Sequence, residues 1–365
     1  MIPLAAVLRR HWPVYERKYR ARLLPSHRRA VAALLSCRTP ALGGQLYRCD
    51  CGQEHYAYHS CNHRACPQCG HADATAWLQR QRRKLLPVPY YLVTFTVPAQ
   101  LRQVIRSHQK DLYPLLLRES AAALREVARQ HKDLGAEIGL LAVLQTWTRD
   151  LRYHPHVHCV VPGGGLSPDR RRWVSPKREG YFLPQSVLAL RFRTRLRQAL
   201  QQQPPQLYLQ IPRAAWSLDW VADVQPVGTG EPALKYLAAY VYRTAFSAER
   251  IRADTDQGIT FSYKDGQDGS TRTLCLPPEQ FLHRFLQHVL PRGLQRVRYF
   301  GFLSAAAKTQ WQRVRALLDW HPPALPPPPP TPGPMCPSCQ KPMTLIGQLP
   351  RAPPRRWPST SPVKL

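Results

Sequence analysis

The sequence has few acidic residues and no long apolar run. Its 365 residues include 22 Asp and Glu against 52 Lys and Arg, which gives a formal net charge of +30. So large an excess of positive charge goes beyond what an acidic small molecule needs, and it suits a polyanion, with nucleic acid as the first candidate. No stretch of about 18 apolar residues occurs, so the sequence predicts no bilayer-spanning helix and no membrane partner.

A secretion signal is also missing from the first residues. Residues 1–8 are largely apolar, but residues 9–11 are Arg, Arg and His and end the run. Of the ten cysteines, six fall between Cys37 and Cys69, and two more form the pair Cys336 and Cys339. Without a secretion signal, this spacing favours metal ligands over disulfides. We therefore expect a reducing, cytoplasmic setting.

Two cysteine-glycine turns predict a structural zinc site near the N-terminus. The segment Cys66-Pro-Gln-Cys69-Gly has the spacing of a zinc knuckle, in which two thiolates converge and the glycine permits a tight backbone. The segment Cys49-Asp-Cys51-Gly is one residue shorter than the usual CxxC turn. The simplest Zn²⁺ site that these turns predict combines Cys49, Cys51, Cys66 and Cys69.

Other cysteines and one histidine remain as further ligands. Cys37, Cys61 and His63 are candidates for a second ion or for replacing a member of the first site. The segment Cys336-Pro-Ser-Cys339 is half a knuckle with no second CxxC turn after it. It either borrows ligands from the N-terminal cluster or is a degenerate remnant. The last residues, to Leu365, are expected to be disordered.

The segment around His156 has the pattern of a metal-binding strand. His154, His156 and His158 alternate along the chain and are followed by apolar residues of high β propensity. Side chains at i, i+2 and i+4 of a strand point to one face, where two imidazoles can hold one divalent cation. A row of polar residues on an exposed strand is the alternative interpretation.

A neighbouring strand offers a third ligand. Residues 138–147 form an apolar run that contains one amide, Gln145, and a turn over 148–152 leads into the histidines. The two runs therefore predict an antiparallel hairpin that brings Gln145 near His156 and His158. The alternative is a surface amide on an edge strand.

Two tyrosines are spaced to share one face of a helix. Pro232 favours a helix start, and Tyr236 and Tyr240 lie four residues apart within the helix predicted over 231–247. An aromatic stripe packed on a sheet is the alternative. Together with a histidine-bound cation and a basic surface, however, the pair fits metal-assisted transesterification of a DNA phosphodiester, with tyrosine as the nucleophile.

The periodicity predicts the remaining elements more coarsely. A basic helical segment over 1–36 is expected to break at Pro13 and Pro25. Strands are expected over 90–98, 207–211, 216–224, 259–263 and 271–276, and helices over 72–86, 100–131, 185–201, 278–289 and 304–319.

These motifs resemble the HUH endonuclease superfamily and, within it, the two-tyrosine rolling-circle transposases of the IS91 group of insertion sequences. The resemblance covers about residues 28–304. It rests on the cluster from Cys37 to Cys69, the strand Leu92 to Pro98, His154-Pro-His156-Val-His158, Tyr236-Leu-Ala-Ala-Tyr240 and Arg298-Tyr299-Phe300-Gly301.

The resemblance implies an α+β fold, with an HUH-type antiparallel sheet, packed helices and a small N-terminal zinc-binding module that helps to recognise DNA. It implies Mg²⁺ or Mn²⁺ at His156 and His158, with Gln145 as the third ligand and His154 as its rival. We expect a basic helical arm and zinc-binding module over residues 1–75, and the nuclease domain over residues 76–304. A helix, proline-rich linker and half knuckle are expected over residues 305–365.

The resemblance also implies the chemistry. Tyr236 and Tyr240 correspond to nucleophiles that cleave and rejoin single-stranded DNA at the ends of a bacterial mobile element through 5′-phosphotyrosine links. A plasmid replication initiator or a conjugative relaxase would use the same chemistry, and the cysteine cluster favours the transposase. A zinc-dependent DNA-binding protein without catalysis, and a zinc hydrolase that uses the three histidines, are the alternatives from other classes.

Overall fold

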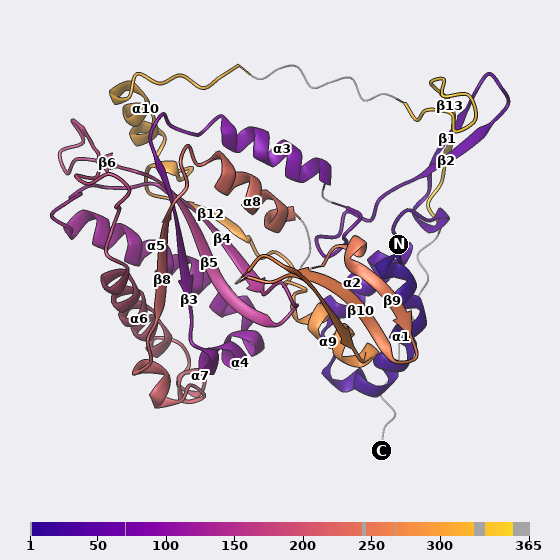
Figure 1. The fold of residues 1–365 in the computed structure, drawn as a ribbon, viewed down its shortest axis with the longest axis horizontal. Coiled ribbons are helices and arrows are strands. Elements are labelled where there is room, and N and C mark those ends of the chain that lie inside the picture. Colours follow the sequence, from indigo (N-terminus) through magenta and orange to yellow (C-terminus); the bar gives the residue numbers. More distant parts are fainter. Residues whose placement is uncertain (1, 70, 243–245, 267, 325–332, 353–365) are drawn as a thin grey trace.

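A five-stranded antiparallel sheet forms the centre of the protein (Figure 1). The computed structural model describes residues 2–69, 71–242, 246–266, 268–324 and 333–352. The strand order is β12-β4-β5-β3-β8, and each neighbouring pair is antiparallel. The strands are β3 (Tyr90–Thr96), β4 (Leu140–Trp147), β5 (Tyr153–Pro162), β8 (Val221–Pro226) and β12 (Val297–Phe300).

Helices cover both faces of this sheet, and the alternation along β5 decides what each face meets. Val157, Cys159 and Val161 join the larger core. The helices on that side are α4 (Ala99–Ser107), α5 (Gln109–Gln130), α6 (Gln185–Gln201) and α7 (Pro205–Leu209). Val160 points the other way and packs with residues of α3 (His71–Arg82) and α8 (Glu231–Tyr242). His156 and His158 are an even number of residues from Val160 and therefore lie on the α8 face.

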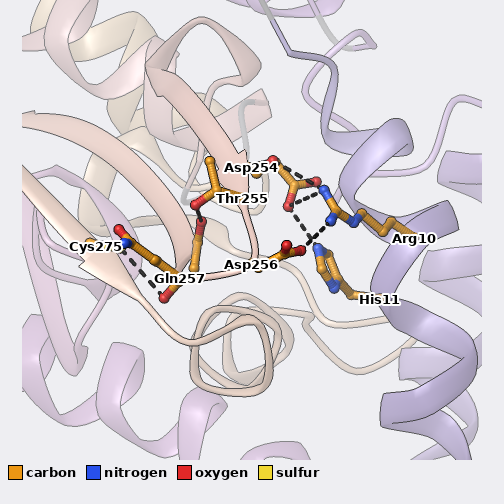
Figure 2. Close-up of polar contacts among 8 residues, drawn as sticks. Arg10, His11, Asp254, Thr255, Asp256, Gln257 and Cys275 are labelled. Atoms are coloured by element: carbon orange, nitrogen blue, oxygen red, sulfur yellow. Dashed lines mark hydrogen bonds and ion pairs between the residues drawn. The ribbon is translucent and has the colours of Figure 1, made fainter.

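A second core lies beside the central sheet. It is built from α1 (Leu4–Tyr19), α2 (Pro25–Ser36), α9 (Pro278–Gln287) and the sheet of β9 (Ile251–Thr255), β10 (Gly258–Lys264) and β11 (Thr271–Leu276). Figure 2 shows how α1 contacts the turn between β9 and β10. Arg10 lies 2.8 Å from the Asp256 carboxylate, and His11 Nε2 lies 2.7 Å from Asp254 Oδ1. The basic N-terminal arm is therefore partly neutralised within the protein.

The last described strand returns to the N-terminal region. β13 (Thr344–Leu349) pairs with β1 (Gly44–Arg48), which also pairs with β2 (Glu54–Tyr58). The expectation of a disordered end is therefore wrong for these residues, while residues 353–365 lie outside the described part. The shorter elements are β6 (Gly165–Leu166), β7 (Trp173–Val174) and α10 (Lys308–Leu317), with α10 packed near Phe302.

The hairpin of β4 and β5 and most of the predicted helices and strands are confirmed. Several details differ. Pro13 lies inside α1 and does not end it. The strand expected over 207–211 is helix α7, because Pro205 stands at the start of a helical turn where its missing N–H is harmless. The strand expected over 216–224 begins only at Val221. No helix in the described ranges has both the length and the apolarity to cross a bilayer.

Candidate active site and metal centres

Three histidines lie side by side along one face of β5. The ring centroids of His154 and His156 are 5.3 Å apart, and those of His156 and His158 are 4.7 Å apart. His158 is buried, and the other two are half-buried. The structure therefore brings together the whole histidine row that the sequence analysis singled out.

Gln145 reaches this row from the neighbouring strand. It is the register partner of His156, and its Oε1 atom lies 3.2 Å from His158 Nε2. A register shift between Gln145 and Trp147 bulges the strand at this point. Such bulges turn side chains toward a site. The Gln145 amide nitrogen donates to the Trp147 carbonyl at 3.1 Å, which leaves the side-chain oxygen facing the imidazole.

Hydrogen bonds at Nδ1 orient both rings, and His158 Nε2 faces the Gln145 oxygen. His156 Nδ1 donates to the carbonyl of His154 at 2.7 Å, so its Nε2 carries a lone pair. His158 Nδ1 lies 3.0 Å from Thr94 Oγ1. Because a hydroxyl can donate or accept, Thr94 supports either tautomer of His158, including the one that presents a lone pair at Nε2.

Burial keeps both of these histidines neutral near pH 7. Burial, helped by the charge of Arg102, lowers the pKa of His156 to about 4 and outweighs the hydrogen bond to the His154 carbonyl, which acts in the opposite direction. Burial also holds the pKa of His158 well below its usual value, with a smaller contribution from His156. A neutral imidazole is the form that binds a metal ion. With the Gln145 oxygen, the two rings form a donor set that fits a divalent cation.

Helix α8 places Tyr236 beside the histidines. The ring centroids of Tyr236 and His158 are 5.9 Å apart, and the two rings meet edge to face. Tyr236 is 39% exposed, and it lines the cavity over the histidines. Tyr240 follows one turn later in α8, and its side chain lies outside the described residues.

A cavity of about 630 Å³ opens over this face of the sheet. The second core forms its other wall through the end of β10. The basic residues that line it are Arg149, Arg152, Arg250 and Lys264, and Asp150 and Asp265 also contribute to the lining. Arg152 is paired with Asp150 at 2.7 Å. The excess of positive charge around the histidines suits a phosphodiester.

A second cavity of about 780 Å³ lies at the far end of α8, near Cys69. Arg64, Arg296, Arg298 and Tyr299 line it. Burial lowers the pKa of Arg296 to about 10, and the nearby charge of Arg64 contributes in the same direction. Arginines and an aromatic ring together are typical of surfaces that bind single-stranded nucleic acid.

Four cysteines of the N-terminal region form a metal-binding cluster. The Sγ atoms of Cys37, Cys61, Cys66 and Cys69 all lie within 4.8 Å of one another. Cys69 Sγ is 3.4 Å from that of Cys37 and 3.6 Å from that of Cys61. Four thiolates around Zn²⁺, with bonds of about 2.3 Å, form a tetrahedron with edges of about 3.8 Å. The cluster fits a structural zinc ion.

The predicted grouping of Cys49 and Cys51 with Cys66 and Cys69 is therefore corrected. Cys66 and Cys69 share their cluster with Cys37 and Cys61, while Cys49 and Cys51 lie with Cys336 and Cys339. The reason is the chain path, because β1 and β2 carry the Cys49 turn away from the Cys66 turn and toward β13 (Figure 1). His63 is in neither cluster, and its Nδ1 accepts a hydrogen bond from the Ala65 amide at 3.1 Å.

The sequence analysis missed some residues of the site. Thr94 lies in a strand that was predicted, and alternation places it on the histidine face, but a threonine in a strand is too common to stand out. Arg250 and Lys264 come from the second core, and no local pattern connects them with the histidines.

The comparisons with known proteins agree with these features. Residues 139–310 match a family described as "Putative transposase", and residues 7–97 match a transposase zinc-binding domain of the IS91 type. No solved structure gives a significant match.

Two relatives cover most of the chain. A protein of Sinorhizobium fredii named "Putative transposase y4qJ" is 36% identical over 344 residues, which are 88% of this chain and 85% of that protein. The transposase for insertion sequence element IS801 of Pseudomonas savastanoi pv. phaseolicola is 28% identical over 292 residues, 75% of this chain and 69% of that protein. The α+β fold, the cysteine clusters and these matches define a zinc-binding transposase. The chain belongs to the IS91 family of transposases.

Proposed function

We propose that this transposase cleaves and rejoins single-stranded DNA by transesterification, with Tyr236 and Tyr240 as nucleophiles and covalent 5′-phosphotyrosine links as intermediates. The observation that carries the proposal is the position of Tyr236, whose ring lies 5.9 Å from that of His158 on the same face of the sheet. Such a reaction serves rolling-circle transposition, in which the energy of each broken bond is kept in the protein-DNA link.

His156, His158 and Gln145 would hold a Mg²⁺ or Mn²⁺ ion through two imidazole Nε2 atoms and one amide oxygen. When bound, the ion withdraws charge from the non-bridging oxygens of the scissile phosphate. The protein's own part is to keep both rings neutral and correctly turned. Burial keeps the rings neutral, and hydrogen bonds with the His154 carbonyl and the Thr94 hydroxyl hold their orientation.

The bonds and protons of this transesterification balance without a nucleotide cofactor. The phenolic oxygen of Tyr236 forms a bond to phosphorus, and the bond from phosphorus to the 3′ oxygen of the preceding nucleotide breaks. The phenol loses its proton to solvent, and the departing 3′ oxygen gains one. Rejoining reverses these changes with a 3′ hydroxyl as the nucleophile. Tyr240, one turn along α8, would take a second DNA end before the first link is resolved.

The two cavities support a single-stranded substrate. Tyr236 lines the cavity over the histidines, and Val241 of the same helix lines the cavity near Cys69. Basic residues line both. We propose that the DNA strand passes along α8 from one cavity to the other, because neutralisation of successive phosphates and stacking on aromatic rings are the usual means of holding an unpaired strand.

The test is a covalent-capture assay. The full-length protein is incubated with Mg²⁺ and labelled single-stranded oligonucleotides that carry the ends of the element encoding it, and the products are separated on a denaturing gel. We expect a labelled band at the mass of the protein plus DNA, which is lost in the Tyr236→Phe, Tyr240→Phe double variant. Tyr208→Phe is the matched control, since Tyr208 lies in α7 on the other face of the sheet and contacts Arg197. DNA cleavage by the double variant at the wild-type rate would instead indicate hydrolysis.

A further inference from the structure

The cysteines outside the first zinc cluster come from the two ends of the chain. Cys49 and Cys51 follow β1, and Cys336 and Cys339 precede β13. Their four Sγ atoms lie within 4.8 Å of one another. Cys49 Sγ is 3.4 Å from Cys339 Sγ, and Cys51 Sγ is 3.6 Å from Cys336 Sγ. These separations match the edges of a tetrahedron of thiolates around zinc, about 3.8 Å, and exceed a disulfide bond of about 2.05 Å.

Both pairs lie in turns of the kind that hold zinc. The Cys49 turn closes through hydrogen bonds from the Gly52 amide to the Cys49 carbonyl at 2.8 Å and from the Cys49 amide to the Gln53 carbonyl at 2.9 Å. Gly52 has a φ of +86°, which favours glycine. The residue missing from the usual CxxC spacing therefore does not prevent this turn from forming a tight loop.

The Cys336 turn is a small hairpin. The Cys336 amide donates to the Lys341 carbonyl at 2.8 Å, and the Met343 amide donates to the Pro334 carbonyl at 3.0 Å. The Gln340 amide also donates to the Cys336 carbonyl at 2.9 Å. These backbone hydrogen bonds hold Cys336 and Cys339 within one tight turn, so that both thiols can face the same ion.

The apolar contacts around these turns are too few to hold the segment together. The local core consists of Cys49, Cys336 and Met343, with Tyr47 packed against it. The strands β1, β2 and β13 are five, five and six residues long, and most of their side chains are exposed or half-buried. Sheets of this size are marginally stable in water, and small modules of this kind usually need a metal or a disulfide.

We infer that Cys49, Cys51, Cys336 and Cys339 bind a second zinc ion, which fastens the C-terminal segment to the N-terminal zinc-binding module. The ion completes a module whose third strand comes from the far end of the sequence. In Figure 1, α10 and β13 lie at opposite ends of the molecule, and β13 lies beside β1 of the N-terminal module. The site is structural, because four thiolates leave no open position on a tetrahedral ion.

Metal content tests this inference on the full-length protein. Mass spectrometry of the metals in purified protein is expected to find two zinc ions per chain. The Cys336→Ser, Cys339→Ser double variant is expected to hold one. Cys275→Ser is the matched control, because Cys275 is exposed and outside both clusters, and it should hold two. One zinc ion in the wild-type protein, two in the double variant, or iron in place of the second zinc would overturn the inference.

A second measurement keeps all four ligands and does not depend on how the variants fold. A protease recognition sequence is inserted among the prolines of residues 322–334, and the purified protein is cut there. The C-terminal fragment should co-elute with the rest of the chain in zinc-containing buffer and separate from it when a chelator removes zinc. A fragment that stays bound after both ions are removed, or cysteines found as disulfides in the intact metal-free protein, would contradict the second site.

Discussion

The imidazole of His158 and the phenol of Tyr236 meet edge to face, with ring centroids 5.9 Å apart, although the residues come from a strand and a helix 78 positions apart in the sequence. Val160, two residues after His158 on the same face, belongs to an apolar cluster that also contains residues of α8 and β4. The apolar packing between α8 and the sheet therefore positions the proposed nucleophile, and the polar residues at the end of the contact provide the chemistry.

Thr94 is predicted to position the proposed metal ligand His158. Replacing it by valine keeps the shape of the side chain and removes the hydroxyl that lies 3.0 Å from His158 Nδ1. We expect the Mn²⁺ concentration needed for half-maximal DNA cleavage to rise about 10- to 100-fold, as is usual when a partner of a ligating histidine is lost. Cleavage at saturating Mn²⁺ should stay near the wild-type rate.

Thr96→Val is the matched control for this measurement. Thr96 is the register partner of His156 two residues further along β3, and it lines the same cavity. The metal requirement of Thr96→Val should stay near that of the wild type. An equal rise in the Mn²⁺ requirement of both variants would show that Thr94 acts only through the packing of β3.

Lys264 is predicted to contact a DNA phosphate. It is exposed at the end of β10 and lines the cavity over the histidines. For Lys264→Ala, the slope of log affinity for a single-stranded oligonucleotide against log salt concentration should become shallower by about 0.7, the value for one phosphate contact. Fluorescence anisotropy measures it. Lys110→Ala, an exposed lysine of α5, should leave the slope unchanged. An unaltered slope in Lys264→Ala would remove this residue from the DNA path.

Acid is predicted to weaken the fold through His288. Burial lowers the pKa of His288 to about 3, even though the ring hydrogen-bonds to the Leu151 carbonyl at 3.2 Å. In the unfolded chain a histidine titrates near pH 6.5, so between about pH 6.5 and 3 the unfolded state binds a proton that the folded state does not. The neutral His288 therefore contributes fully to the free energy of unfolding above pH 6.5. Between about pH 6.5 and 3, this free energy falls by about 1.4 kcal/mol for each pH unit of acidification.

Urea denaturation at pH 7 and pH 5 measures this effect. His288→Gln keeps an N–H donor for the Leu151 carbonyl and cannot titrate. Between pH 7 and pH 5 its free energy of unfolding should therefore fall less than that of the wild type, and the difference between the two falls should be up to about 2 kcal/mol. His55→Gln changes an exposed histidine and should behave as the wild type does. The same pH dependence in all three proteins would assign the acid sensitivity to other groups.

Gly301 is predicted to tolerate no side chain. Its φ is +61°, and a Cβ atom built there would clash with the carbonyl oxygen of Ile138. Gly301→Ala should lower the free energy of unfolding by about 3 kcal/mol, the upper part of the range for a strained backbone position. At Gly293, φ is +80° but a Cβ atom would meet open space, so Gly293→Ala should lower it by only about 1 kcal/mol. A urea unfolding midpoint for Gly301→Ala equal to that of Gly293→Ala would contradict the predicted clash.

The parts of the fold that the sequence predicts well are those with a local periodicity. The two apolar runs over residues 138–147 and 153–162, joined by a short turn, are enough to predict the hairpin that brings Gln145 near His156. The four-residue spacing of Tyr236 and Tyr240 likewise depends only on the helix. These contacts lie within one hairpin or one helix, where the backbone geometry determines the neighbours.

The partners of the cysteines are not determined in this way. Cys51 and Cys336 are 285 positions apart, and the spacing of neither turn indicates which other turn it meets. The pairing depends on β13 returning to β1, and a six-residue strand whose first three residues are all exposed has too weak a pattern to predict. For the same reason, the contribution of Lys264 to the cavity could be found only from the folded chain.

The pairing of β1 with β13 has a consequence for synthesis of the protein. β1 leaves the ribosome long before β13, so the three-stranded sheet forms only after all the residues between the two strands have been made. A chain that stops early keeps the edge of β1 bare, and an unpaired edge is a site of association with other chains. Only molecules whose synthesis has passed β13 can therefore complete the N-terminal module of the transposase.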